Sequence, residues 1–115
     1  MHGGGTGAAG ADMTAIKGAG VTSIAYGGSA GRYVITLADK WNALLAFHAQ
    51  VVDASGNAHW SVNVVSEDVA SAKTITIQVW SAATTVAPAL ANLSTDEKLK
   101  FTAILSNTAQ PPTAR

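Results

Sequence analysis

The strictest alternation in the chain runs through Lys73-Thr-Ile-Thr-Ile-Gln-Val-Trp-Ser81. Apolar residues (Ile75, Ile77 and Val79) fall on one side of an extended backbone, and polar residues fall on the other. Because successive side chains of a strand point to opposite faces of a sheet, this segment predicts a half-buried β-strand.

Five further segments have the same extended character: residues 21–26, 32–37, 45–53, 59–66 and 98–106. The glycine-rich link between the first two predicts a β-hairpin. The segments 45–53, 59–66 and 73–81 are expected to form a meander of three antiparallel strands. Segment 45–53 is apolar on both faces, which predicts either a central strand or a strand covered by a partner.

The region before the last strand allows two interpretations. Ser94-Thr-Asp-Glu97 has the capping-box spacing and predicts one short helical turn, followed by a strand with Leu99, Phe101, Ala103 and Leu105 facing inwards. The alternative is a helix from Ser94 through Leu105. Residues 82–93 are apolar but aperiodic and contain Pro88, so an ordered loop is expected there.

The two ends differ from the middle in composition. Residues 1–17 are rich in glycine and alanine, which predicts a flexible N-terminal arm: either a disordered tail, or a segment that orders against a neighbouring subunit through Met13 and Ile16. Residues 108–115 are expected to form an extended C-terminal tail. The predicted fold is therefore all-β: a small antiparallel sandwich or barrel of about six strands over residues 18–107.

Charge is sparse. Only 12% of the 115 residues are charged, against roughly 25% in soluble proteins, and the formal net charge is zero. The surface must then be either polar and uncharged or covered by partners, and the second explanation favours an oligomer. A balanced charge gives no basic field to attract nucleic acid or anionic lipid. No apolar run is long enough for a membrane helix, and no signal-peptide pattern is present.

The sequence offers no chemistry that would predict an enzyme. His2, His48 and His59 are far apart in sequence, there is no cysteine, and the acidic residues fall mostly in expected turns. Gly27-Gly-Ser-Ala-Gly-Arg32 lacks the Lys-Ser or Lys-Thr pair of a phosphate-binding loop. We therefore expect no catalytic residues, no cofactor and no metal.

Tryptophans are the strongest candidates for contact residues. Trp60 is in phase with apolar neighbours and is expected in the core. Trp80 is in phase with the polar face of its strand, so it lies either at a strand end under a loop or on a contact surface. Trp41 falls in a break between strands and is either a core residue or an anchor for a partner. Buried aromatic anchors often dominate the energetics of interfaces.

Several segments together resemble a known class of protein. They are Gly20-Val-Thr-Ser-Ile24, Gly31-Arg-Tyr-Val-Ile-Thr-Leu37, Ala38-Asp-Lys-Trp41, Leu44-Leu45, Asp68-Val69, Lys73-Thr-Ile-Thr-Ile77 and Leu105-Ser-Asn107. The chain, over roughly residues 18–107, resembles small structural proteins of tailed bacteriophages, of the capsid decoration or cement type. The shared features are glycine turns and strand phasing, and none of them is catalytic.

The resemblance implies a virion structural protein on the outer capsid surface, often a homotrimer, which clamps adjacent subunits of the major capsid protein. Partner contacts are expected from Met13, Ile16, Trp41 and Trp80. A phage tail or fibre-attachment subunit is the alternative with the same composition. A β-sandwich that binds carbohydrate or another ligand on Trp80 or Trp41 is the alternative from a different class.

Overall fold

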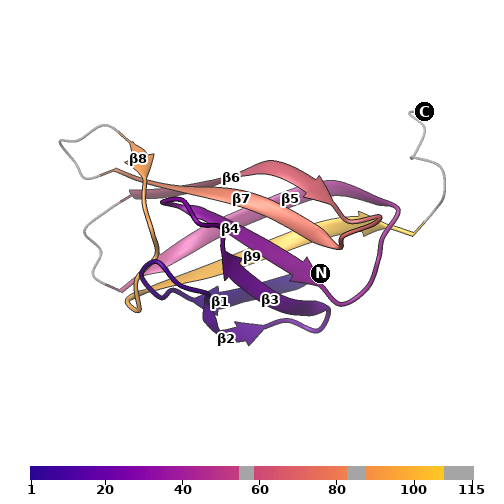
Figure 1. The fold of residues 1–115 in the computed structure, drawn as a ribbon, viewed down its shortest axis with the longest axis horizontal. Helices are drawn as coiled ribbons and strands as arrows, with labels where there is room; N and C mark the ends of the chain where they lie inside the picture. The colour runs from indigo at the N-terminus through magenta and orange to yellow at the C-terminus, as the bar shows by residue number, and fades with distance from the viewer. Residues whose placement is uncertain (55–58, 83–87, 108–115) are drawn as a thin grey trace.

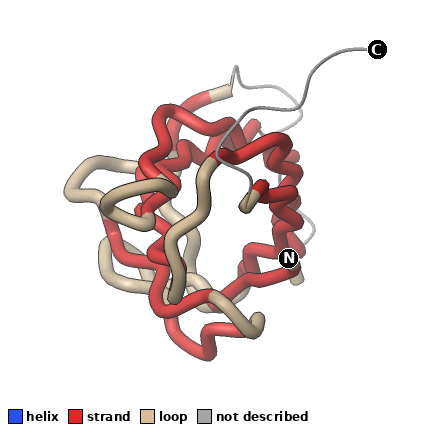
Figure 2. Tube along the Cα trace, turned by 90° about the vertical axis from the view of Figure 1, so that its right-hand side faces the viewer, coloured by secondary structure: helices blue, strands red, loops and turns tan. Residues whose placement is uncertain are grey.

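The computed structural model describes residues 1–54, 59–82 and 88–107, which form two antiparallel β-sheets (Figure 1). Sheet A has the strand order β2-β1-β9-β5, and sheet B has the order β3-β4-β7-β6, with β8 paired to β7. The strands are β1 (His2–Thr6), β2 (Thr14–Lys17), β3 (Val21–Tyr26), β4 (Arg32–Leu37), β5 (Ala43–Asp53), β6 (His59–Asp68), β7 (Thr74–Ala82), β8 (Ala89–Leu90) and β9 (Glu97–Ser106). Seen end-on, the strands surround the interior of a sandwich (Figure 2).

The expected all-β sandwich is confirmed, and the six predicted strands correspond to β3, β4, β5, β6, β7 and β9. The three further strands, β1, β2 and β8, lie in segments that the sequence predicts as arm or loop. No helix among the described residues is long and apolar enough to cross a membrane.

The core consists of the inward-facing residues of both sheets. On β7, Ile75, Ile77 and Val79 are fully buried, as the alternation predicts. Leu99, Phe101 and Ala103 of β9 are also buried, and Leu105 is half-buried against them. The other buried apolar residues are Met13, Ile24, Tyr33, Ile35, Leu37, Val69 and Leu93. Each large apolar side chain removed from water contributes roughly 1.5–3 kcal/mol before entropy is counted.

The hairpin of β3 and β4 is confirmed, with Ile24 opposite Ile35 and Tyr26 opposite Tyr33. The link closes because Gly31 adopts a φ of 73°, a left-handed conformation that favours glycine. A Cβ at Gly31 would also lie 2.6 Å from the carbonyl oxygen of Val79, so the turn packs directly on β7.

The predicted three-strand meander is wrong. β6 and β7 do pair, but β5 belongs to sheet A and pairs with β9 from Ala43 opposite Ser106 to Asp53 opposite Glu97. The chain therefore crosses from one sheet to the other between β5 and β6, which lets both strands turn an apolar face towards the core. β5 is consequently an edge strand, and the expectation of a central strand is wrong.

The first 17 residues lie within the sandwich, in contrast to the expected separate arm. β1 lies between β9 and β2 in sheet A, with Gly4 opposite both Lys100 and Lys17. The glycines that suggested flexibility permit this packing, because a Cβ at Gly4 would overlap the carbonyl oxygen of Leu99. The low strand preference of glycine is overridden by pairing on both sides of β1.

The segment that starts at Ser94 forms a turn and then a strand. One of the two hydrogen bonds of a capping box is present: the Ser94 backbone N–H donates to Glu97 Oε1 at 3.3 Å. The Ser94 hydroxyl also donates to Glu97 Oε2 at 2.8 Å, and the Glu97 backbone N–H donates to the Ser94 carbonyl oxygen at 3.1 Å. The chain then continues as β9, so the predicted helical turn and the alternative long helix are both wrong. Pairing of β9 with β1 and β5 along its length explains the strand.

Two expectations concern residues outside the described part of the chain. The predicted C-terminal tail, residues 108–115, lies wholly there. The predicted loop over 82–93 falls there in part; of its described residues, Ala89–Leu90 form β8.

Candidate functional site

The two predicted anchors near the N-terminus are used inside the domain. Met13 is 5% exposed and belongs to the core, and its backbone N–H donates to the carbonyl oxygen of Ile24. Ile16, on β2, is half-buried and packs against the same core. Both side chains therefore contribute to the interior of their own domain.

Trp41 also packs on the core. Its side chain is half-buried, and its backbone N–H donates to the carbonyl oxygen of Val69 at 2.9 Å. The indole Nε1 atom is buried and has no hydrogen-bond partner among the described residues. This position corresponds to the core interpretation of Trp41.

Trp80 lies on the outer face of sheet B. Its indole N–H donates to Asn63 Oδ1 at 2.7 Å, and its nearest cross-strand neighbours are Ser61 on β6 and Leu90 on β8. The side chain is half-buried under this arrangement. Of the four predicted contact residues, Trp80 is the one on an outer sheet face.

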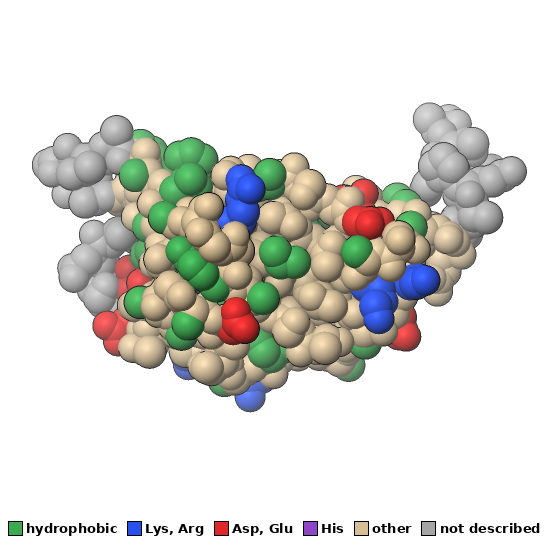
Figure 3. Space-filling model, viewed as in Figure 1, with side chains coloured by type: hydrophobic (Ala, Val, Ile, Leu, Met, Phe, Trp, Pro, Cys, Tyr) green, Lys and Arg blue, Asp and Glu red, His purple; other side chains and the backbone are tan. Residues whose placement is uncertain are grey.

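The surface around sheet B carries little charge. In the view of Figures 1 and 3, where β4 and β7 lie in front of β5 and β9, charged side chains are few and scattered. The outward positions of β7 are Thr74, Thr76, Gln78 and Trp80, all half-buried. Sparse overall charge thus coincides with a polar, uncharged face.

Four large apolar side chains are exposed among the described residues: Leu45 and Val52 on β5, Val65 on β6 and Ile104 on β9. Leu45 (46% exposed) lies at a β-bulge in β5, between Leu44 and Ala46, and Val65 (41% exposed) lies at a β-bulge in β6. Ile104 of β9 (55% exposed) is directly opposite Ala46. A bulge adds a residue outside the regular alternation, so each bulge turns an apolar side chain outward.

Because of these bulges, the exposure of Leu45 and Val65 does not follow from the alternation of the sequence. A strict period of two assigns every second residue to one face, and segment 45–53 is apolar on both faces, so the period alone does not mark Leu45 as exposed. The available signal was the pair of adjacent large apolar residues, Leu44-Leu45 and Val64-Val65, since a strand can bury only one of two neighbours.

β5 and β6 run in opposite directions along one side of the sandwich (Figure 1). They contact one another without forming a ladder, and the Trp60 indole donates to Asp53 Oδ2 at 2.9 Å where they approach. β5 carries no lysine or arginine, the residues that commonly protect an edge strand from association. We call Leu45, Val65 and Ile104, each of which lies on β5 or β6 or on the strand paired with β5, the edge cluster.

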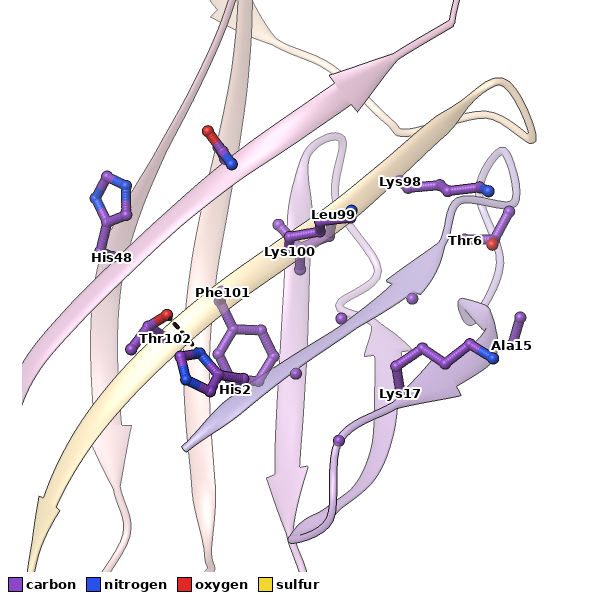
Figure 4. A pocket seen from close by; sticks show the side chains of 15 residues that line it. His2, Thr6, Ala15, Lys17, His48, Lys98, Leu99, Lys100, Phe101 and Thr102 are labelled. Carbon is purple, nitrogen blue, oxygen red and sulfur yellow. Dashed lines mark hydrogen bonds between the residues drawn. The ribbon is translucent and has the colours of Figure 1, made fainter.

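A second feature is a hollow of about 730 Å³ on the outer face of sheet A (Figure 4). It lies over β1 and is lined by residues of β1, β2, β5 and β9 together with Gly18. Its polar side chains include His2, His48, Lys98 and Lys100.

No metal-binding arrangement is found among the described residues. His48 is on β5 in sheet A and His59 is on β6 in sheet B. No three His, Asp or Glu side chains within residues 1–54, 59–82 and 88–107 gather closely enough to hold an ion.

The buried carboxylate of Glu97 and the buried hydroxyl of Tyr33 have structural partners. Glu97, 8% exposed, accepts hydrogen bonds from the Ser94 hydroxyl and backbone N–H. Burial raises the pKa of Tyr33; its hydrogen bond with Leu93 acts in the opposite direction, and nearby Tyr26 and Glu97 raise the pKa further. Neither group faces the hollow.

Comparison of the chain with models of protein families, with curated proteins and with solved structures finds no match.

Proposed function

We propose that this protein is a non-enzymatic structural subunit of a virion, of the capsid decoration type, which binds protein surfaces through the edge cluster. The observation that carries the proposal is the exposure of Leu45, Val65 and Ile104 beside two long edge strands with little protecting charge. Large apolar residues exposed at a surface favour association with another protein.

The bulges also indicate how a partner would bind. A continuous strand added to an edge needs an uninterrupted row of backbone donors and acceptors, which a bulge disrupts. Binding through the side chains of the edge cluster is therefore favoured over addition of a strand. Such binding buries apolar area and needs no reacting group.

The proposal includes self-association as a homotrimer and binding to the major capsid protein on the outer surface of the shell. The resemblance to phage decoration proteins supports this choice of partner. A phage tail or fibre-attachment subunit would use the same surface on a different partner.

Sedimentation equilibrium of the purified chain and of Leu45→Lys/Ile104→Lys tests the proposal. The unaltered chain is expected to sediment as a trimer and to bind empty capsid shells, and the double variant is expected to lose both properties. Thr22→Lys is the matched control, because Thr22 is exposed at a bulge of the other outer strand of sheet B. A chain that stays monomeric at high concentration and does not bind shells would refute the proposal.

A carbohydrate-binding module is the second candidate. Trp80 lies on the outer face of sheet B beside Ser61 and Asn63, whose side chains can hydrogen-bond to sugar hydroxyls. Titration of glycans against tryptophan fluorescence distinguishes this function, since a saturable change that Trp80→Phe abolishes would favour it over capsid binding.

A further inference from the structure

The hollow on sheet A exists because β1 has no side chain at its centre. Gly4 lies directly opposite Lys100 of β9 on one side and Lys17 of β2 on the other. The rows on either side carry side chains: Thr6 lies opposite Lys98, and His2 lies opposite Thr102. Gly4 is itself buried, so the floor of the hollow at this point is backbone, and long cationic side chains border it.

The lining of the hollow is basic. It includes Lys17, Lys98 and Lys100, all exposed, together with His2 and His48, and it includes no aspartate or glutamate. Within the described part of the chain, the structure gives none of these lysines an ion-pair partner. Lysines without acidic partners around one concave surface attract anions. No acidic residue in the lining opposes that attraction.

The zero net charge of the chain conceals this surface. Seven acidic residues balance seven basic ones over the whole chain, a balance that predicts no basic field. Residues far apart in sequence form the hollow, however, so the balance over the whole chain does not hold locally. Pairing of β1 with β9 and β2 is what brings Lys17 into the same surface as Lys98 and Lys100.

The spacing of the lysines indicates the class of ligand. Lys98 and Lys100 are two residues apart on one strand, so their backbone positions are about 7 Å apart, and Lys17 is two strands away from β9, about 10 Å. Lys98 and Lys17 extend in the same direction in Figure 4, with Thr6 between them. One small monoanion cannot engage charges this far apart as well as a ligand with several anionic groups.

The polar and aromatic residues of the lining narrow the choice of ligand class. Thr6, Gln50 and Thr102 add hydrogen-bonding groups, and His2 Nδ1 lies 3.0 Å from Thr102 Oγ1. The one aromatic hydrocarbon ring in the lining, Phe101, is 4% exposed and stacks on Phe47, so it offers no platform for a nucleobase.

We propose that this hollow binds a compact ligand carrying two or more tetrahedral oxyanion groups, phosphate or sulfate, held between Lys17, Lys98 and Lys100. Lysine ammonium groups act as point charges and accept such groups without the planar geometry that arginine favours. The site is separate from the edge cluster and does not depend on the proposed capsid function.

Isothermal titration calorimetry with inorganic tripolyphosphate, inorganic monophosphate and a sulfated disaccharide tests the proposal. Tripolyphosphate is expected to bind at least about tenfold more tightly than monophosphate, because several of its charges contact the lysines at once. Its binding is expected to weaken as the salt concentration is raised. The sulfated disaccharide shows which ligand supplies the oxyanion groups. Tighter binding of that probe indicates a sulfated sugar, and tighter binding of tripolyphosphate indicates an oligophosphate.

Lys98→Gln/Lys100→Gln is expected to weaken binding of the preferred probe by at least about tenfold, since both side chains are exposed and their loss should not affect folding. Lys40→Gln, which removes an exposed lysine outside the hollow, is the matched control and should bind as the unaltered chain does. The proposal is overturned if no probe binds, if Lys40→Gln weakens binding equally, or if the double variant binds unchanged. A single-stranded oligonucleotide that binds more tightly than either probe would also overturn it.

Discussion

The hydroxyl oxygen of Tyr33 accepts a hydrogen bond of 2.8 Å from the backbone N–H of Leu93. Both residues are fully buried. The bond connects strand β4, which carries Tyr33, to the irregular segment between β8 and β9, which carries Leu93. A buried N–H group needs a partner, and here a side chain supplies it. This bond fixes the segment that leads into β9.

Tyr33→Phe should destabilise the protein by about 1–3 kcal/mol, because it leaves the N–H of Leu93 buried without a partner. Urea denaturation of the variant and of the unaltered chain measures the difference. Tyr26→Phe is the control, since the structure records no hydrogen bond to the Tyr26 hydroxyl among the described residues, and it should have a smaller effect.

Stability should fall at alkaline pH in a way that depends on Tyr33. Burial raises the pKa of Tyr33 above its ordinary value of 10.0, so the folded state holds this proton more tightly than the unfolded state does. The resulting stabilisation is complete below the unfolded pKa and is lost as pH rises from there through the higher folded pKa. As pH rises above about 10, denaturation midpoints should decline less steeply in Tyr33→Phe than in the unaltered chain; equal slopes would contradict the assignment to this residue.

Gly4→Ala should prevent β1 from pairing normally, because the new Cβ would overlap the carbonyl oxygen of Leu99. We expect a loss of more than about 2 kcal/mol, as for other severe steric conflicts in packed regions. Gly28→Ala provides the comparison: Gly28 has a φ of 81° but nothing within 4 Å of an added Cβ, so only the backbone strain of about 1–2 kcal/mol applies. Thermal unfolding of both variants would show whether steric overlap outweighs strain.

Ser94→Ala should cost about 1–3 kcal/mol, since the hydroxyl of Ser94 donates to the largely buried carboxylate of Glu97. Thr95→Ala, at the next and exposed position, should change the free energy of unfolding little. Equal effects of the two substitutions in urea denaturation would show that the Ser94–Glu97 bond does not stabilise the turn.

Periodicity predicted the parts of the fold in which neighbouring residues carry the information. Ile75, Ile77 and Val79 are buried as expected, and so are Leu99, Phe101 and Ala103. The β3–β4 hairpin followed from its glycine-rich link. In each case a local pattern and the tertiary structure agree.

The features that the sequence did not predict depend on contacts between distant segments. β1 is a strand because β9 and β2 pair with it, although its own glycines disfavour one. The outward position of Leu45 comes from a bulge that shifts its register against β9. The hollow needs Lys17 and Lys100 on either side of Gly4, which no local pattern specifies.

The pairing of β1 and β5 with β9 also determines the order in which the protein can assemble during synthesis. All four main strands of sheet B are complete once residue 82 has left the ribosome, whereas β9 begins at Glu97 and is needed by both of its neighbours in sheet A. Until β9 emerges, the nascent chain must hold one edge of the glycine-rich β1 and the whole of the apolar β5 unpaired. The two halves of the sandwich are therefore made at different times, and exposed strand edges in the interval favour aggregation and chaperone binding.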